Sequence, residues 1–513
     1  MNLLYCNPNA KRIKLNSDTR RHLAIDELIN MIAVTDDDKE IVSSVFSEMT
    51  DNTETILYRQ EILSDFLSND SFCKELEEII HKLDVLKEFY DHNHFLKEKK
   101  TSIWDLLDYS QEMEVYCQII EGMNELFSKY TINSQGLKDI SESIKEVIDS
   151  DRIAELKEII SSLRADISTV KSVNLGVNLD ASLHPEEIVF MSFSGIPYRS
   201  KINNKTAWGI SIASQKRITY NDPSPVMKFL SQELERELGK KVKKTKSDLK
   251  EYINLKGYFL LDIIKDLKYY LLIAKYANKL QNNGYSYCFP KIDYNADSVN
   301  IKGIYNIRLT EDGTENIVKN DFTFSEKEKI YILTGPNRGG KTMLTQAVGL
   351  SAFMASMGLF VTADSYNGYP FCDILTHFPA DENLTLSLGR LGEEAVRVQQ
   401  IVKEATPRTL VLFNETYSST CSSDGLYLAK DLVHILKHNN VPVIFNTHIH
   451  ELARSTEEMN QWDGPTDIVS LSMQIVDNVN TFKVLRSEPD ICSYAHNIAT
   501  KYGITYEQML NNK

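Results

Sequence analysis

The sequence predicts a mostly α-helical N-terminal half with a small β-rich insert, followed by an α/β domain whose sheet is largely parallel. Three observations support this fold class. Leu, Ile, Glu, Lys and Asp recur at helical spacing through residues 1–165, where Gly and Pro are rare. Within residues 166–224, Val, Ile and Phe stand between Gly, Asn and Pro, which favours short strands. From residue 285 onward, strand-like and helix-like segments alternate, as in α/β domains.

The composition is that of an ordinary globular protein. The 513 residues allow two to four domains, and the net charge of -15 argues against a surface that binds nucleic acid everywhere. A local basic patch is still compatible with this charge, because phosphate contacts need only a few positioned cations. The seven cysteines form no CxxC pair, and the apolar stretch over 347–363 is too short for a membrane span. We therefore expect a cytoplasmic protein with no membrane association.

The segment YILTGPNRGGKTML, residues 331–344, carries a phosphate-binding pattern. Its centre fits G-x-x-x-x-G-K-[ST] in full and lies between a strand-like and a helix-like run. Such a loop turns its backbone N–H groups toward an anion at the N-terminus of the helix. We expect Lys341 to reach the β- and γ-phosphates of ATP and the Thr342 hydroxyl to ligate Mg²⁺. The predicted ATP-binding residues of the loop are Gly335, Pro336, Asn337, Arg338, Gly339, Gly340, Lys341 and Thr342.

Two further strand-like runs end in polar pairs. TLVLFNETY ends its apolar run at Asn414-Glu415, where P-loop ATPases usually carry Asp-Glu to hold Mg²⁺ and to orient water. An amide at Asn414 predicts weak Mg²⁺ holding and slow hydrolysis. VPVIFNTHIHEL ends in Thr447-His448, where a γ-phosphate sensor would lie. His448 and His450 on one face of this strand leave a metal pair as the alternative, without a third ligand.

TGPNRGGKT, LVLFNETYSSTCSSDGL and IFNTHIHEL together resemble the ATPase domain of the MutS family, over about residues 290–455. ILYRQEILSDFL resembles the arginine-containing helix of the family's helical core, and residues 40–285 match by pattern and order alone. The resemblance implies an ABC-type P-loop ATPase domain over 285–513. It also implies a helical core over 1–165, a β-rich segment over 166–224 and lever- or clamp-like helices over 225–284.

The resemblance also implies roles for particular residues. Lys341, Glu415 and His448 would be catalytic, with Glu415 as the carboxylate and His448 as the switch residue. Asp424 and Gly425 would lie at a homodimer seam. An ungapped count places the family's trans-acting S-x-F-x-x-E signature at Gly389, Leu391 and Glu394, so glycine replaces the signature serine.

The chain has no room for the family's N-terminal mismatch-reading domain, so we expect a short member. Phe46-Ser47-Glu48 and Phe324-Ser325-Glu326 match that domain's Phe-x-Glu wedge, but a structural role suits both better. We expect an ATP-gated homodimer that binds DNA by its shape, in DNA repair or recombination. One alternative is an ATP-dependent ribosome or RNA-assembly factor, and another is a nucleotide-binding scaffold with slow turnover.

A cluster of lysines lies in the expected lever region. KKVKKTKSDLK contains Lys240, Lys241, Lys243, Lys244 and Lys246, which would contact a nucleic-acid backbone if the lever helices form a clamp. The alternative is a solvated helix face with acidic neighbours.

Overall fold

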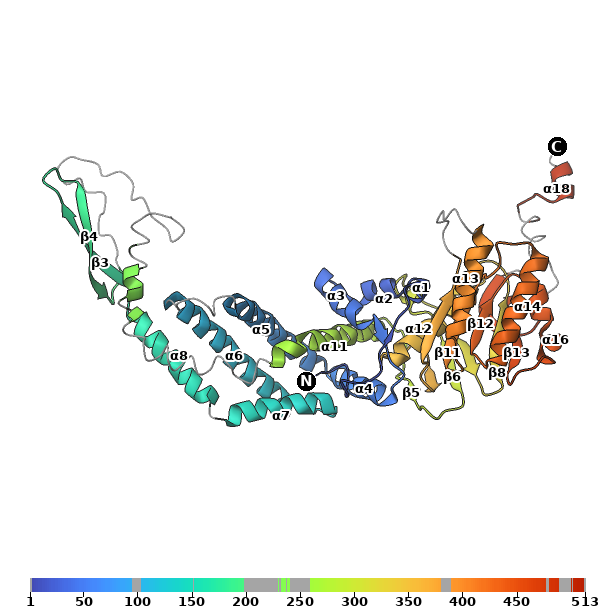
Figure 1. Ribbon diagram of the computed structural model, residues 1–513, viewed down its shortest axis with the longest axis horizontal. Helices are drawn as coiled ribbons and strands as arrows, with labels where there is room; N and C mark the ends of the chain where they lie inside the picture. The colour runs from blue at the N-terminus through green and yellow to red at the C-terminus, as the bar shows by residue number, and fades with distance from the viewer. Residues whose placement is uncertain are drawn as a thin grey trace. The chain divides into compact units, whose positions relative to one another are not determined.

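The structure of the protein is a computed structural model (Figure 1). It describes residues 2–94, 103–150, 152–197, 259–379, 389–476, 479–488 and 502–511, together with 229, 232–236, 238, 239 and 500. The chain combines helices and sheets, as the sequence predicts, and divides into two compact units. The first unit contains Ser71–Thr131 and Lys138–Ile264, and the second contains Asn2–Asp70, Ile132–Leu137 and Lys265–Lys513. No helix among the described residues has both the length and the apolar character that crossing a bilayer requires.

The residues of the first unit that the structure describes form long helices and one hairpin. Its helices are α5 (Asp70–His94), α6 (Ile103–Lys129), α7 (Gln135–Asp149) and α8 (Arg152–Ser168). Helix α6 contacts α8, and both contribute fully buried residues such as Ile120 and Leu163. Strands β3 (Ser172–Leu179) and β4 (Pro185–Ser194) pair antiparallel. The hairpin therefore lies within the segment for which the sequence predicts short strands.

The second unit is built around a six-stranded sheet. Its strands are β8 (Glu328–Thr334), β10 (Asp373–His377), β11 (Thr409–Asn414), β12 (Val443–Asn446), β13 (Asp467–Val476) and β14 (Val479–Arg486). Their order is β10-β11-β12-β8-β13-β14, and every neighbouring pair is parallel except β13 and β14. The near-continuous apolar sequences of β8 and β11 follow from burial on both faces of a parallel sheet.

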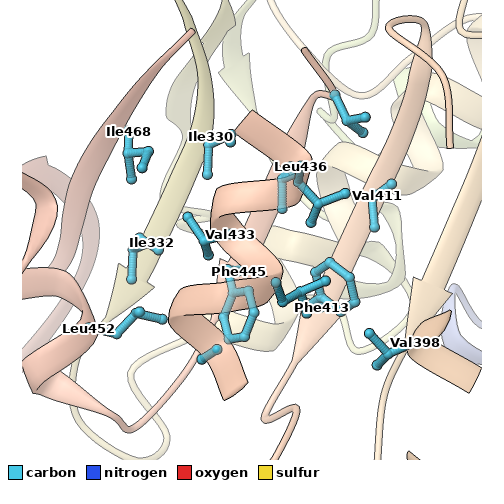
Figure 2. Close-up of a cluster of buried hydrophobic side chains, with 14 of the residues drawn as sticks. Ile330, Ile332, Val398, Val411, Phe413, Val433, Leu436, Phe445, Leu452 and Ile468 are labelled. Atoms are coloured by element: carbon cyan, nitrogen blue, oxygen red, sulfur yellow. The ribbon is translucent and has the colours of Figure 1, made fainter. Parts of the chain in front are cut away.

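Helices α13 (Gly389–Glu404) and α14 (Ser422–His438) contribute to the core on this sheet. Figure 2 shows Val433 and Leu436 of α14 beside Val411 and Phe445 of the strands. The short helices α15 (His450–Arg454) and α16 (Thr456–Asn460) contact β13. A smaller sheet, ordered β5-β9-β6-β7, contains β5 (Lys291–Ile292), β6 (Val299–Ile304), β7 (Asn320–Phe324) and β9 (Ser365–Gly368).

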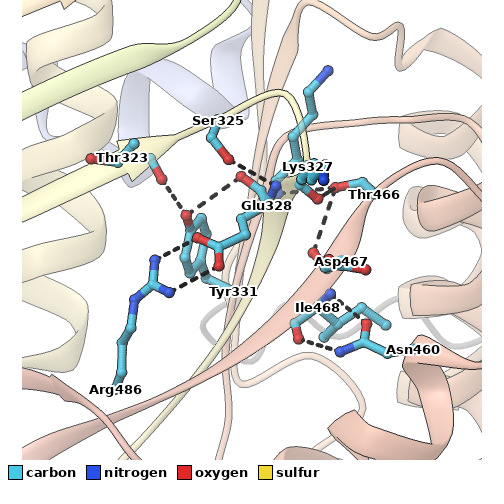
Figure 3. A network of polar contacts seen from close by, with 11 residues as sticks. Thr323, Ser325, Lys327, Glu328, Tyr331, Asn460, Thr466, Asp467, Ile468 and Arg486 are labelled. Carbon is cyan, nitrogen blue, oxygen red and sulfur yellow. Dashed lines mark hydrogen bonds and ion pairs between the residues drawn. The ribbon is translucent and has the colours of Figure 1, made fainter.

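A polar network fixes the N-terminal end of β8 (Figure 3). Arg486 of β14 donates from both terminal nitrogens to the Glu328 carboxylate, at 2.9 and 2.5 Å. This contact holds the pKa of Glu328 below its usual value. The Lys329 N–H donates to Thr466 Oγ1 at 3.0 Å, and the Tyr331 hydroxyl donates to the carbonyl of Thr323. The strand that leads into the glycine-rich loop is therefore anchored at its far end.

Helix α12 (Lys341–Ser356) is buried at every residue except Thr342 and Met343, and it contacts β10, β11 and β12. Gly349 lies at a close contact of this helix. A Cβ atom at Gly349 would lie 2.5 Å from Leu23 Cδ2 and 2.7 Å from Leu412 Cδ1. The helix thus packs between the N-terminal segment and the central sheet with no room for a side chain at this point.

The N-terminal residues belong to the second unit. Their elements are β1 (Ile13–Lys14), α1 (Ser17–His22), α2 (Ile25–Ile32), α3 (Asp36–Val45), β2 (Glu48–Met49) and α4 (Thr53–Ser68). Arg59 of α4 is buried and donates to the carbonyls of Leu4 at 2.6 Å and Met357 at 3.4 Å. Helix α11 (Phe259–Asn282) is tied to the same region, because the Tyr270 hydroxyl donates to the Leu3 carbonyl at 2.8 Å. Elements distant in sequence therefore surround the end of α12.

Two buried histidines lie where α1 meets β10. His22 Nδ1 lies 2.8 Å from Thr376 Oγ1, and its ring stacks on Phe378. His377 Nδ1 lies 2.8 Å from Thr416 Oγ1, in the loop that follows β11. Burial lowers the pKa of each histidine from 6.5 to about 4. Both rings are therefore neutral near pH 7.

Candidate functional site

The glycine-rich loop (Gly335–Gly340) joins β8 to α12. Gly335 and Gly340 have φ angles of 138° and 92°, which favour glycine, and Arg338 also has a positive φ of 62°. A Cβ atom at Gly335 would lie 2.8 Å from Met473 Cβ, so this position needs glycine for space as well as conformation. The loop therefore ends directly at the N-terminus of a buried helix, where unpaired N–H groups attract anions.

Lys341 is the first residue of α12, and only 6% of its surface is exposed. Its ammonium donates to the carbonyls of Gly335 at 3.0 Å and Pro336 at 3.2 Å. Burial lowers the pKa of Lys341, and the nearby carboxylate of Glu415 opposes that shift. The cation is thus held across the loop by carbonyl contacts that phosphate oxygens could replace.

Two side-chain oxygens meet at the carboxyl edge of the sheet. Asn414 ends β11 and Asn446 ends β12, and the two residues are paired in register. Thr342 Oγ1 donates to Asn414 Oδ1 at 3.2 Å, and Asn446 Nδ2 donates to the same oxygen. Hydroxyl and amide oxygens are ligands that Mg²⁺ accepts. Thr342 and Asn414 are therefore together, as the sequence predicts, and Asn446 joins them.

Glu415 and His448 form a pair beside the loop. Glu415 has a φ of 53°, and its N–H donates to the Asn446 carbonyl at 2.9 Å. His448 Nε2 lies 2.9 Å from Glu415 Oε1. The expectation that His448 and His450 share a strand face is wrong, because β12 ends at Asn446 and His450 begins α15. Among the described residues, no three His, Cys, Asp or Glu side chains gather as metal ligands would.

One cavity of about 540 Å³ is lined by the loop, Glu415 and His448 together. Residues 337–342 of the loop and the start of α12, Glu415 and His448 line one part of it. The remaining lining is more apolar and comes from the segments around residues 304–320 and 473–482, including Tyr305, Ile317 and Phe482. This volume lies within the usual range for small-molecule sites. The lining of the cavity therefore combines polar and charged groups of the loop with apolar side chains of these segments.

The residues expected at a dimer seam lie on two helices, α13 and α14. Gly389 begins α13, and Glu394 is buried and accepts a hydrogen bond from Ser419 Oγ at 3.0 Å. Asp424 is exposed in the first turn of α14, whereas Gly425 is buried beside the Tyr417 carbonyl. Glu394 thus contacts the loop that follows Glu415 within its own chain, and the trans-acting role stays a prediction. Lys240, Lys241, Lys243, Lys244 and Lys246 lie outside the described residues.

Sequence reasoning missed several residues at this site. Asn446 had a visible signal, since it is polar at the end of an apolar strand. Tyr305 and Phe482 had none, because they reach the cavity from segments far apart in the chain. Asn320 joins these segments by donating to the Phe482 carbonyl at 3.0 Å.

Comparisons with known proteins match both halves of the chain. The model of MutS domain V matches residues 331–509, and the model of the MutS2 N-terminal domain matches residues 51–283. A DNA mismatch repair protein MutS from Streptococcus thermophilus is 34% identical over 142 residues, which are 27% of this chain and 16% of that protein. The protein of the same name from Lactococcus lactis subsp. cremoris is 28% identical over 193 residues, 37% of this chain and 23% of its own. These matches span less than a quarter of either relative.

Proposed function

The chain belongs to the MutS family, and on that premise we propose that it binds Mg²⁺–ATP in the cavity beside the glycine-rich loop and hydrolyses it slowly. The observation that carries the proposal is that residues 337–342, Glu415 and His448 line one cavity. The ABC-type P-loop architecture over 285–513 and the lever-like helices over 225–284 are part of the same proposal.

The residues present fit this nucleotide and this metal. The N-terminus of α12 and the Lys341 ammonium would bind the triphosphate, since both present positive charge to the same end of the cavity. The oxygens of Thr342 and Asn414 would hold Mg²⁺. Bound there, the metal would neutralise charge on the β- and γ-phosphates. Apolar side chains in the lining, such as Ile304, Leu309 and Ile317, suit a nucleobase.

Hydrolysis would use Glu415 and His448. Glu415 would orient a water molecule and accept its proton as the water oxygen bonds to the γ-phosphorus and the bond to the β-phosphate oxygen breaks. His448, 2.9 Å from Glu415 Oε1, would fix the direction of that carboxylate. Asn414 supplies a dipole in place of the full charge of an aspartate, so the transition state is less stabilised. Bound ATP would then act mainly by holding the protein in one long-lived conformation.

The proposed partner is DNA, held by an ATP-gated homodimer. The relatives named above are DNA mismatch repair proteins, which favours DNA over an RNA–protein assembly. We propose recognition of DNA shape, because the two Phe-x-Glu sequences cannot act as wedges. Phe46 and Phe324 are both completely buried in the second unit. A side chain that unstacks a base has to reach the surface.

Replacing Lys341 by methionine tests the nucleotide site. Met keeps most of the side-chain volume but removes the charge, and one charge-assisted contact is worth about 1.5 to 3 kcal/mol. Calorimetry should therefore show a Kd for Mg²⁺–ATP raised roughly 10- to 150-fold. Lys430→Met is the matched control, since Lys430 pairs with Glu458 on α16 and does not line the cavity. Equal affinity in wild type and Lys341→Met would refute the proposal.

A further inference from the structure

We propose that Asn446 is a positioning residue that turns the carbonyl oxygen of Asn414 toward Thr342, and so makes an asparagine usable as a metal ligand. The proposal rests on the Mg²⁺–ATP function proposed above. Asn414 Oδ1 accepts hydrogen bonds from both Thr342 Oγ1 and Asn446 Nδ2. Asn446 is completely buried and Asn414 is 7% exposed, so water does not compete freely for these contacts.

The need for a positioning group follows from the chemistry of an amide. An aspartate at residue 414 would present an oxygen in either orientation, but an asparagine presents either an oxygen or an NH₂ group. Only the oxygen can ligate a cation. The Thr342 hydroxyl cannot select between the two orientations, because a hydroxyl both donates and accepts. The NH₂ group of Asn446 only donates, so it favours the orientation in which Asn414 presents its oxygen.

A purely structural role explains Asn446 poorly. Its own Oδ1 is buried and has no hydrogen-bond partner among the described residues. A buried acceptor without a partner lowers stability, and an apolar residue of the same size would avoid that cost. Asn460 shows the contrasting case (Figure 3). Its Nδ2 donates to the Ile468 carbonyl at 2.9 Å, and its Oδ1 accepts from the Ile468 N–H at 2.7 Å.

The backbone places the two amides without help from their side chains. Asn414 and Asn446 are register partners on neighbouring parallel strands, and the Glu415 N–H continues the ladder to the Asn446 carbonyl. Substitution of Asn446 should therefore leave the position of Asn414 unchanged and remove only the preference for its orientation. This separation makes the inference testable.

The test is the Mg²⁺ dependence of ATP affinity, measured with a fluorescent ATP analogue in Asn446→Leu. Leucine has nearly the same size and no donor. We expect the Mg²⁺ concentration for half-saturation to rise roughly three- to tenfold, the scale of one hydrogen bond. Affinity in EDTA should stay the same, and urea denaturation should show no loss of stability. Asn460→Leu is the control, and it should lower stability without changing the Mg²⁺ dependence.

A double substitution separates positioning from structure. In an Asn414→Asp background, Asn446→Leu should change the Mg²⁺ half-saturation by less than about twofold, because either carboxylate oxygen can face Thr342. An equal shift in both backgrounds would overturn the inference, and so would the absence of a shift in the Asn414 background. A wild type that binds no ATP under any condition would instead refute the proposed function itself.

Discussion

Two buried histidines should make the stability of the second unit depend on pH. His22 and His377 are 7% and 3% exposed, and burial is the main reason that the pKa of each falls from 6.5 to about 4. Arg21 lowers the pKa of His22 further and Arg397 that of His377, while Asp18 opposes both shifts. The unfolded chain takes up these protons near pH 6.5, but the folded chain resists them until about pH 4. Stability is therefore complete above pH 6.5 and falls as the pH approaches 4.

The magnitude follows from proton linkage. Between pH 7 and pH 5, one such histidine lowers the free energy of unfolding by about 1.9 kcal/mol. Two acting independently lower it by roughly 4 kcal/mol. That is a large share of the about 5 to 15 kcal/mol that stabilises a typical domain. The loss should thus be measurable well above pH 4.

The assay compares wild type with the double variant His22→Asn, His377→Asn. Asparagine can keep a hydrogen bond like that of Nδ1 to Thr376 or Thr416 but does not titrate. Urea denaturation at pH 7 and pH 5 gives the two free energies of unfolding. Trp462 contacts the core around α14, so it reports on this unit once the other two tryptophans, at 104 and 208, are replaced by Phe.

The variant should lose roughly 4 kcal/mol less than wild type between the two pH values. Carboxylates titrate in both proteins and largely cancel in the comparison. Equal losses in wild type and the double variant would refute the reasoning, because they would show that neither histidine resists protonation in the folded chain.

The remaining predictions concern activity and partners. Asn414→Asp should raise steady-state phosphate release about ten- to a hundredfold, because one charged contact is worth roughly 1.4 to 2.7 kcal/mol in the transition state. Glu415→Gln should abolish phosphate release. Fast turnover in wild type that Asn414→Asp leaves unchanged would contradict slow hydrolysis. If Glu394 and Asp424 complete the partner's site, the ATPase rate per subunit should rise with protein concentration, and adding Glu415→Gln to wild type should depress the rate non-linearly. A concentration-independent rate would count against the dimer. In gel-shift assays, branched DNA should bind more tightly than plain duplex DNA, and the affinity should fall steeply as the salt concentration rises. A preference for mismatched over matched duplex above about tenfold would contradict shape recognition, because it would require side chains that recognise bases.

The parts of the structure that could be predicted from the sequence are those with local signals. The loop pattern at 335–342 predicted a strand before it and a helix after it, and β8 and α12 lie there. Glu415 and His448, which follow two apolar strands, lie together because parallel strands present their carboxyl ends at one edge. Thr342 and Asn414 are therefore neighbours although 72 residues separate them in the chain.

The parts that could not be predicted depend on contacts between distant segments. The Thr19 hydroxyl donates to the Ile374 carbonyl at 2.8 Å, although 355 residues separate them in the chain. The hydrophobic periodicity of the sequence does not predict such a contact. The environment that makes His22 and His377 resist protonation arises only when α1 packs on β10. The amide orientation at Asn414 likewise depends on a partner from another strand, so composition and spacing cannot reveal it.

The packing around Gly349 has a consequence for the evolution of this sequence. Residues 23, 349 and 412 share one space, since a Cβ atom on Gly349 would lie within 2.7 Å of a methyl group on each leucine. A larger residue at 349 is therefore tolerable only with a smaller residue at 23 or 412. Among homologous chains these three positions should covary, and the volume summed over them should vary less than the volume at any one of them. A substitution that becomes fixed at one of these positions would then limit which residues are tolerated at the other two.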